Sequence, residues 1–353
     1  MPVRRISPPD KDTEDAAALV QVARSFYVEG LTQAQVAARH QLSQSSVSRL
    51  LLKARNDKIV RVYIEPPRLQ WLEAKLKEAL APKGVERICL VPSGPEDNTS
   101  NLGVATAHML ADLLTEQVQA NRETIRIVMS CGATLGAGVE SFRDLLDRDP
   151  DLLATLTGKR LQVYPSAVHA DSLLDMVLYP SALVAAFTFL LMNHFKSVFP
   201  IEGHIPSLPP QFYRQPERQR QAYVKKYQLS SLLTCMKESD IFLLGIGMTT
   251  NINFERIEQQ IGIPIDRDEF PAESNNIPIR RDGTQHDEIA RALLGINIEE
   301  LRHTSRQPGR IVMAVAGGPR KKEAIAAAVA NPYFNTLITD EENAQNLLAH
   351  PVH

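Results

Sequence analysis

The first 64 residues carry apolar side chains in three short runs with helical spacing. In the first run, residues 15–29, apolar positions recur every three or four residues, and Gly30 follows where a helix commonly ends. Thr32 is placed to cap a second helix. Ser43 is placed to cap a third, which runs to about Asn56. The pattern therefore predicts a small unit of three helices.

The second and third predicted helices have the pattern of a helix-turn-helix. Ala37 is small enough for two helices to cross closely, and Leu42 is expected to plug the turn. Gln41 stands where the turn usually has glycine, so either its backbone adopts a positive φ or the turn differs. With Val47 and Leu50 facing inward, polar side chains remain outward on the first turns of the third helix. The residues that we predict to contact DNA are Gln33, Ser43, Gln44, Ser45, Ser48, Arg49 and Lys53.

These residue types suit the major groove of DNA. Arginine can make two hydrogen bonds to guanine and glutamine two to adenine, whereas serine permits close approach. Residues 21–64 hold seven Lys or Arg against two acidic residues, a charge of +5 that leaves about −7 for the rest of the chain. Lys53, Arg55 and Lys58 are expected to add contacts to phosphate. The alternative is an ordinary three-helix bundle with a solvated polar face.

Residues 58–81 predict a short strand followed by a helix. "KIVRVYIEPP" is rich in β-branched residues and ends in prolines, as in a rudimentary wing. In "RLQWLEAKLKEAL" the leucines form one helical stripe: Leu69, Leu72, Leu76 and Leu80. The stripe either packs on the rest of the chain or pairs with its own copy. Two half-sites in an operator need a two-fold partner, so self-association is expected by either route.

From about Ala81 the pattern changes to apolar strands that alternate with helices. The strand-like runs are "RICLVPS", "TIRIVMS", "KRLQVYPS", "DIFLLGIG", "RIVMAVAGG" and "TLITD". Such alternation predicts an α/β fold with a mainly parallel sheet and ligands beyond the carboxyl ends of its strands. We therefore expect three segments: an all-α helix-turn-helix domain over residues 1–64, a connector helix over 65–81 and an α/β effector domain over 82–353.

Three glycine-containing loops follow strands of this predicted sheet. "SCGATLGAG" precedes a helix, where backbone amides and a hydroxyl favour an anion. "GIGMTT" is the second loop, and "AGGPRKKEAI" places a lysine at a helix start. The residues that we predict to bind an anionic effector are Gly132, Ala133, Thr134, Leu135, Gly245, Gly247, Glu273 and Lys321. Tight turns are the alternative at each loop, and Glu273 either accepts hydroxyl hydrogen bonds from a polyol or is a loop charge.

Composition and missing motifs narrow the class of protein. Three widely separated cysteines indicate a reducing compartment without disulfides, and "MPVRRISPPD" is not followed by the apolar run of a secretory signal. The uncharged stretch 176–192 is short and broken by Pro180, so it predicts a buried strand end and a core helix rather than a membrane span. The nine histidines lack zinc spacing, and G-x-S-x-G and Walker A motifs are absent. We therefore expect a cytoplasmic protein without a metal, a cofactor or catalytic residues.

The chain resembles the SorC family of bacterial transcriptional regulators, which are related to the DeoR group. The resemblance covers nearly the whole chain and is most specific in "YVEGLTQAQVAARHQLSQSSVSRLLLKARNDKIVRVYI". "DIFLLGIG" is similar to the family's D-x-x-L-x-G-I-G, and "VAGGPRKKEAIAAAV" and "LITDEENAQNLL" to its closing elements. The resemblance implies a sugar-isomerase and CoA-transferase-like effector domain that binds a phosphorylated sugar, and a dimer or tetramer.

The resemblance also implies roles for single positions. "SCGATL" matches G-x-G-x-T-L, so Gly132 to Thr134 inherit a phosphate cradle, with Ser130 in place of a glycine. Glu273 stands nine residues before the "DG" turn, as the family's acidic ligand residue does, and Lys321 matches the lysine of G-G-x-x-K. Arg280 replaces a common aspartate, which suggests an effector that is either atypical or more negatively charged. The expected function is an effector-controlled regulator that binds operator DNA; the alternative is a sugar-phosphate isomerase or deaminase-like enzyme with a DNA-binding appendage.

Overall fold

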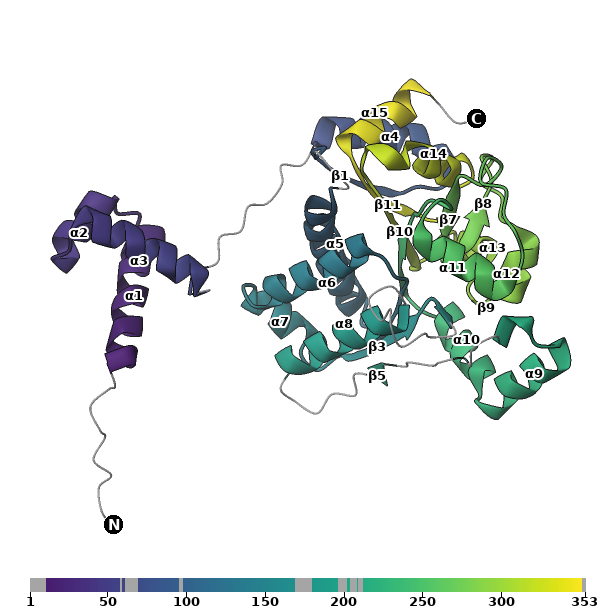
Figure 1. Cartoon of the computed structure of the whole chain (residues 1–353), viewed down its shortest axis with the longest axis horizontal. Helices are drawn as coiled ribbons and strands as arrows, with labels where there is room; N and C mark the ends of the chain where they lie inside the picture. Colours follow the sequence, from purple (N-terminus) through teal and green to yellow (C-terminus); the bar gives the residue numbers. More distant parts are fainter. Residues whose placement is uncertain are drawn as a thin grey trace, which may run out of the picture. The chain divides into compact units, whose positions relative to one another are not determined.

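The computed structural model describes residues 11–57, 59–60, 69–94, 98–168, 180–195, 202–203, 208 and 212–350. The chain divides into two compact units, residues 1–65 and residues 66–353 (Figure 1). Each unit buries apolar side chains in a core of its own.

Three helices form the first unit, as the apolar spacing predicts: α1 (Lys11–Tyr27), α2 (Gln33–His40) and α3 (Gln44–Asn56). Thr32 caps α2 through a capping box with Gln35, and the Ser43 hydroxyl caps α3 by accepting the Ser46 N–H. Leu50 lies only partly buried at the edge of the core. The buried core residues are Leu19, Val22, Ala23, Val36, Ala37, Val47, Leu51 and Ala54.

The turn between α2 and α3 depends on Gln41. This residue adopts a left-handed backbone with a φ of 56°, so a glutamine takes the conformation usually given to glycine. Leu42 is 37% exposed, so the expectation that its side chain plugs the turn is wrong. The Leu42 N–H instead donates to the Ala37 carbonyl and closes the turn through the backbone. The predicted wing falls largely on residues 61–68, outside the described residues.

The leucine stripe that follows belongs to the second unit. In α4 (Gln70–Leu80), Leu72, Leu76 and Leu80 are buried in that unit's core, and the helix packs on β1 and α15. The stripe is therefore a packing face of the body, and its pairing with a second copy is excluded because the leucines are already covered.

A parallel sheet forms the centre of the second unit. Within the described residues its strands are β1 (Arg87–Val91), β2 (Thr124–Met129), β3 (Arg160–Pro165), β5 (Glu202–Gly203), β6 (Ile241–Gly245), β10 (Ile311–Val315) and β11 (Thr336–Asp340). They lie in the order β1-β11-β10-β6-β2-β3-β5, and all neighbouring pairs are parallel. The short strands β4 (Ala167–Val168) and β9 (Leu294–Gly295), and β7 (Ala272–Ser274) and β8 (Ile277–Ile279), pair antiparallel.

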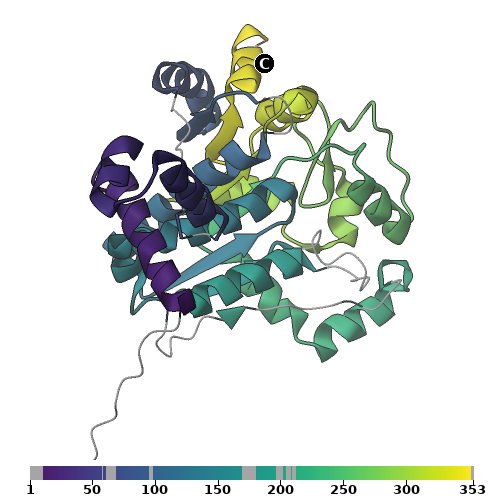
Figure 2. The ribbon, with the colours of Figure 1, turned by 60° about the vertical axis from the view of Figure 1, so that its left-hand side comes forward.

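Helices pack on both faces of this sheet (Figure 2). One face carries α5 (Thr99–Gln119), α6 (Ala133–Leu146), α7 (Pro150–Leu156) and α8 (Pro180–His194). Side chains of α4 join the core on the other face, together with α9 (Glu217–Lys226), α10 (Leu229–Lys237), α11 (Ile252–Ile261), α12 (Asp287–Ala292), α13 (Ile298–Ser305), α14 (Lys322–Ala330) and α15 (Glu341–Ala349). Three 3₁₀ turns complete the described elements: η1 (Ala81–Lys83), η3 (Phe212–Arg214) and η4 (Pro319–Lys321).

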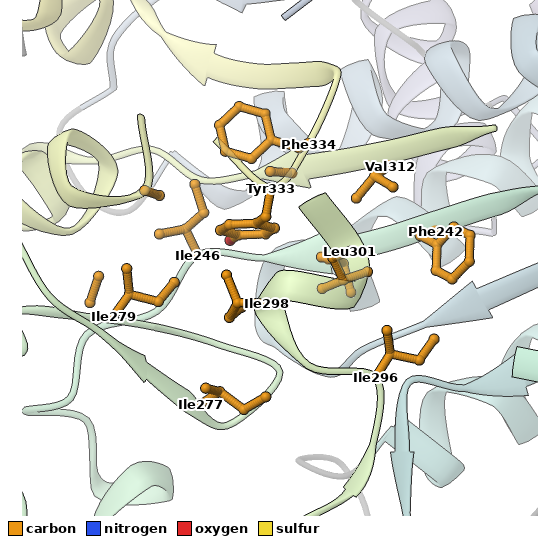
Figure 3. Packing of buried hydrophobic residues seen from close by; sticks show 14 of the residues in the cluster. Phe242, Ile246, Ile277, Ile279, Ile296, Ile298, Leu301, Val312, Tyr333 and Phe334 are labelled. Atoms are coloured by element: carbon orange, nitrogen blue, oxygen red, sulfur yellow. The ribbon is translucent and has the colours of Figure 1, made fainter. Parts of the chain in front are cut away.

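Alternate residues of the central strands serve the two cores. In β6, Ile241 and Leu243 face the core under α5 to α8, whereas Phe242 and Leu244 face the opposite core. Figure 3 shows Phe242 in the second core, near Leu301 of α13. Because helices cover both faces of the sheet, nearly every residue of these strands is apolar, and the strands form continuous apolar runs in the sequence.

The strand order reverses between β2 and β6. From β2 the chain continues to β3 and β5, whereas from β6 it continues to β10 and β11 on the opposite side. Such a point leaves an opening between the loops at the carboxyl ends of two neighbouring strands, where ligands bind in open α/β sheets. The fold class predicted from the sequence is confirmed.

The uncharged stretch 176–192 gives helix α8 from Pro180 onward, and residues 169–179 lie outside the described part. Val184, Phe187 and Leu191 are buried against the sheet, as a core helix requires. The predicted core helix is confirmed, and its other face, with Phe189 and Met192, is exposed. Among the described residues there is no helix long and apolar enough to cross a membrane.

Candidate functional site

A cavity of about 600 Å³ opens where the strand order reverses. It is lined by the loops that follow β2, β6 and β10 and by the β7–β8 hairpin. All eight residues predicted to bind the effector line it: Gly132, Ala133, Thr134, Leu135, Gly245, Gly247, Glu273 and Lys321. The structure thus brings together three loops that are far apart in the sequence; their role in binding stays a prediction.

One end of the cavity has the features of an anion site. Gly132 precedes α6 with a φ of 132°, a conformation that favours glycine, so the first amides of α6 lie at the cavity wall. Thr99 brings the start of α5 to the same cavity, and Arg320 and Lys321 bring two cations from η4. Helix N-termini and cations both favour negative charge, so this end suits a phosphate group.

Ser130 holds two of the loops together. Its hydroxyl accepts the Gly245 N–H at 3.2 Å, and the Ser274 hydroxyl donates to the Gly245 carbonyl at 2.9 Å. Serine in place of the family's glycine therefore does not fill the cavity, because its side chain is directed at the neighbouring loop. The contact ties the loop after β2 to the loop after β6.

Glu273 supplies a carboxyl group to the same cavity, within electrostatic reach of Lys321. It lies in β7, and its carboxylate accepts the Asn276 N–H at 3.0 Å. Burial raises the pKa of Glu273 to about 7, although this hydrogen bond and the charge of Lys321 act in the opposite direction. A half-protonated carboxyl near neutral pH can both accept and donate hydrogen bonds, which suits the hydroxyls of a polyol.

Cys131 lies beside this carboxyl group in the cavity wall. Burial raises the pKa of Cys131 to about 12, and the charge of Glu273 acts in the same direction. The thiol therefore remains protonated at neutral pH and is a weak nucleophile. The cavity gains a neutral, polarizable surface at this point.

The β7–β8 hairpin is held in place by Asn275. Asn275 and Asn276 both have positive φ, 53° and 62°, which closes the two strands by a two-residue turn. The Asn275 side chain donates to the carbonyls of Ser166 at 3.1 Å and Ile296 at 2.7 Å. The consecutive asparagines in "ESNNIPI" are a signal for this hairpin, where only a loop was expected from the sequence.

Several other cavity residues were missed because their types are common in loops. They are Thr99, Cys131, Thr250, Asn251, Asn276 and Arg320. Arg280, in contrast, is absent from the described cavity lining. It pairs with Glu269 at 2.6 Å and stacks over Phe270, so the suggestion that it adds positive charge for the effector is wrong.

The predicted DNA-contact residues lie on one helix and its flanks. Gln44, Ser45, Ser48, Arg49 and Lys53 are exposed on α3, as a recognition helix requires. Ser43 is exposed but caps α3, and Gln33 is half-buried at the start of α2. Contact with DNA stays a prediction for all seven.

Two further cations, Arg55 and Lys58, follow the predicted contact residues in the sequence. The Arg55 guanidinium donates to the Tyr27 hydroxyl at 2.7 Å and stacks over its ring, which fixes it against α1. Lys58 lies outside the described residues.

Leu52 is 59% exposed on the same helix as Ser45 and Ser48, which its place in an apolar run of the sequence did not indicate. An exposed apolar side chain on a recognition helix suits a thymine methyl group.

The described residues contain no cluster of His, Cys, Asp or Glu that could hold a metal ion. The cavity is therefore built from loop amides, hydroxyls, amide side chains, one carboxyl group and two cations. These groups can bind a polar anion by hydrogen bonds and charge.

The chain is similar in sequence and in fold to known proteins. The family model described as "Putative sugar-binding domain" matches residues 202–349. The crystal structure of the full-length sorbitol operon regulator SorC from Klebsiella pneumoniae covers 97% of this chain and 100% of its own, at 20% identity and a TM-score of 0.65. The chain is similar to SorC-type sugar-binding regulators.

Curated relatives of the chain are named transcriptional regulators. The chain is 23% identical over 350 residues to the transcriptional regulator LsrR of Klebsiella pneumoniae, covering 94% of this chain and 92% of the relative. It is 22% identical over 341 residues to LsrR of Escherichia coli K12, with 94% of each covered. A DeoR family transcriptional regulator from Listeria monocytogenes covers 79% of this chain and 98% of its own, at 19% identity and a TM-score of 0.55. The expectation of a transcriptional regulator rather than an enzyme is confirmed by these named relatives.

Proposed function

We propose that this SorC-like regulator binds operator DNA through α3 and that a phosphorylated sugar in the cavity controls this binding. The proposal is supported by one observation: anion-binding groups and hydrogen-bonding groups line the same cavity. Helix starts with Arg320 and Lys321 supply groups that favour an anion, and Glu273 with amide and hydroxyl side chains supplies hydrogen-bonding groups. A phosphorylated sugar carries a matching group for each kind: a dianionic phosphate and several hydroxyls.

The DNA-binding part of the proposal rests on charge and exposure. The first unit is basic within an acidic chain, and the side chains on the outer face of α3 are hydrogen-bonding types. Two copies of α3 are needed to read two half-sites, so the acting form is at least a dimer.

Control by the effector follows from a population shift. A ligand changes DNA affinity only if it binds one arrangement of the subunits better than another. Ser130, Gly245 and Ser274 connect the loops around the cavity, so a ligand that bridges the anion end and Glu273 favours one arrangement of these loops. Differential affinities of fivefold to a hundredfold and more are typical of such coupling, about 1–3 kcal/mol.

Calorimetric titration of the full chain tests the effector. The titrants are a panel of sugar phosphates, the same sugars without phosphate, and inorganic phosphate. Saturable binding of one sugar phosphate, at least tenfold tighter than its free sugar and than inorganic phosphate, supports the proposal. Equal affinity for a sugar and its phosphate would contradict the anion end, and no binding of any titrant would contradict the effector class.

A further inference from the structure

Asp340 connects the end of β11 to the loop after the neighbouring strand β10 (Figure 1). It is the last residue of β11 and is 1% exposed. One carboxylate oxygen, Oδ1, accepts the Asn343 N–H at 3.0 Å and so caps α15. The other oxygen, Oδ2, accepts the Gly318 N–H at 2.5 Å, although Gly318 lies 22 residues earlier in the chain. The cap of α15 uses only Oδ1, so the contact of Oδ2 serves the loop.

Asn343 holds the same glycine by its carbonyl group. The Asn343 side-chain amide donates to the Gly318 carbonyl at 3.1 Å and to Oδ1 of Asp340 at 2.7 Å. Both polar groups of the Gly318 backbone are thus bonded to buried side chains. Gly318 has a φ of 97°, which favours glycine, and a Cβ atom at Gly317 would stand 2.7 Å from Oδ2 of Asp340. The two glycines after β10 therefore allow the backbone to approach the carboxylate.

The loop that these contacts hold carries two cations of the cavity. The Lys321 N–H donates to the Gly318 carbonyl at 3.1 Å, which closes the turn of η4. Arg320 and Lys321 line the cavity, whereas Asp340 and Asn343 are not among the described residues that line it. Because Gly318 belongs to the same turn as the two cations, a displacement of this glycine displaces both of them.

We propose that Asp340 and Asn343 are positioning residues for the anionic group of the effector, and that they act through the loop of Arg320 and Lys321. They set the affinity for a phosphorylated ligand without touching it. This inference rests on the proposed function, in which the two cations bind the phosphate group. A loop that is already held in its binding geometry binds more tightly, because less ordering is needed on association.

The charge of Asp340 makes the sign of its effect informative. A carboxylate near the cavity repels an anion, so a purely electrostatic role predicts that neutralising it strengthens phosphate binding. Positioning predicts the opposite. In Asp340→Asn the side chain keeps its shape, but one acceptor oxygen becomes a donor NH2 group. That group faces the N–H of either Gly318 or Asn343, so one of the two contacts is lost.

Calorimetric titration of the full chain tests the proposal. The titrants are inorganic phosphate, the sugar phosphate of the panel that the wild type binds most tightly, and the same sugar without phosphate. Asp340→Asn should weaken the binding of both phosphate compounds by about tenfold, because the cations that meet the phosphate are no longer held in place. The affinity for the free sugar should stay within about twofold, whereas a general loss of structure lowers all three affinities alike.

Asp240→Asn is the matched control. Asp240 is also a buried carboxylate beside a strand, since it directly precedes β6 and accepts the Arg126 N–H at 2.8 Å. It lies at the amino-terminal edge of the parallel sheet, whereas the cavity lies at the carboxyl ends of the strands. The substitution removes a buried charge of the same kind and should leave all three affinities unchanged.

Removal of the two cations shows whether Asp340 acts through them. In a chain that carries Arg320→Ala and Lys321→Ala, the further change Asp340→Asn should weaken sugar phosphate binding by less than about twofold, because the groups that it positions are gone. A further loss of about tenfold in that chain would show that Asp340 acts by another route and would overturn the inference.

Asn343→Ala covers the case in which Asp340→Asn fails to fold. It removes the two side-chain hydrogen bonds of Asn343 and keeps its backbone N–H, so sugar phosphate binding should weaken by roughly threefold. An unchanged affinity in this variant overturns the inference.

The other outcomes separate this inference from the proposed function. Unchanged or tighter binding of the sugar phosphate by a folded Asp340→Asn chain overturns the inference alone, and so does an equal loss for the sugar phosphate and its free sugar. A wild type that binds no sugar phosphate contradicts the proposed function and this inference together.

Discussion

Gly247 and Glu273 are joined backbone to backbone, and the Glu273 carboxyl group lies over the glycine. Each donates an N–H to the other's carbonyl, at 2.8 and 3.0 Å. A Cβ atom at position 247 would stand 1.9 Å from Oε1 of Glu273 and 2.8 Å from its carboxyl carbon. The glycine of "GIGMTT" is therefore required by the position of a carboxyl group 26 residues later in the chain.

Gly247→Ala is expected to weaken effector binding by roughly tenfold or more, because the Glu273 carboxyl group must move and its hydrogen bonds to the ligand are lost. DNA affinity without effector should stay within twofold. Gly136→Ala is the control, since a Cβ atom there meets nothing within 4 Å. Calorimetric titration of both variants measures the difference; equal affinities would show that Glu273 does not contact the ligand.

Glu273 should also make the stability of the second unit depend on pH. Burial raises the pKa of Glu273 from 4.5 to about 7, so the folded chain binds more protons than the unfolded chain between these values. Stability contributed by the protonated carboxyl is present below pH 4.5 and is lost as the pH rises through 7. Relative to Glu273→Gln, the wild type should lose on the order of 1–3 kcal/mol of unfolding free energy over this range. Urea unfolding of both proteins at pH 5 and pH 8 measures this, and parallel pH profiles would argue against a buried, neutral carboxyl.

Arg49→Ala should lower the affinity for operator DNA by about 1–3 kcal/mol and reduce discrimination between operator and random DNA. The side chain is exposed, so the melting temperature should not change. Arg39, which pairs with Glu29, is the control cation on the neighbouring helix. If both substitutions weaken operator and random DNA alike, Arg49 contacts phosphate rather than a base.

Leu51 and Leu52 form a matched pair on α3. Leu51 is 5% exposed in the core of the first unit, whereas Leu52 is 59% exposed. Leu51→Gln should destabilise the unit by about 2–4 kcal/mol because it buries an unsatisfied amide. Leu52→Gln should leave stability within about 0.5 kcal/mol but weaken operator binding, if the leucine contacts DNA. Thermal unfolding followed by DNA titration separates the two effects, and an unchanged operator affinity in Leu52→Gln would remove this residue from the interface.

The elements that the sequence predicted well are those with a strong local pattern. Thr32 and Ser43 cap helices as expected, and the apolar runs form the strands of one parallel sheet. The eight predicted effector residues line a single cavity, because loops at the carboxyl ends of neighbouring parallel strands converge wherever the strand order reverses.

What the sequence could not supply depends on contacts between distant segments. The leucine stripe of α4 has the same spacing whether it covers a sheet or pairs with a copy, and only its burial in the body decides between them. The ion pair between Arg280 and Glu269 could not be predicted, because nothing in the sequence indicates which acidic residue lies beside Arg280. The exposure of Phe189 could not be predicted either. In an uncharged apolar stretch, composition does not indicate which side of the helix packs on the sheet.

The most direct test of the whole account is fluorescence anisotropy on labelled DNA from the gene's own upstream region, at fixed salt, with wild type and Lys321→Ala. Wild type should bind saturably, and one sugar phosphate should shift its DNA affinity by fivefold or more. Lys321→Ala should bind the DNA as tightly as wild type but respond to that sugar phosphate only at roughly tenfold higher concentration, since a cation at the anion end is gone. Specific DNA binding that is indifferent to every sugar phosphate in both proteins would contradict effector control through this cavity.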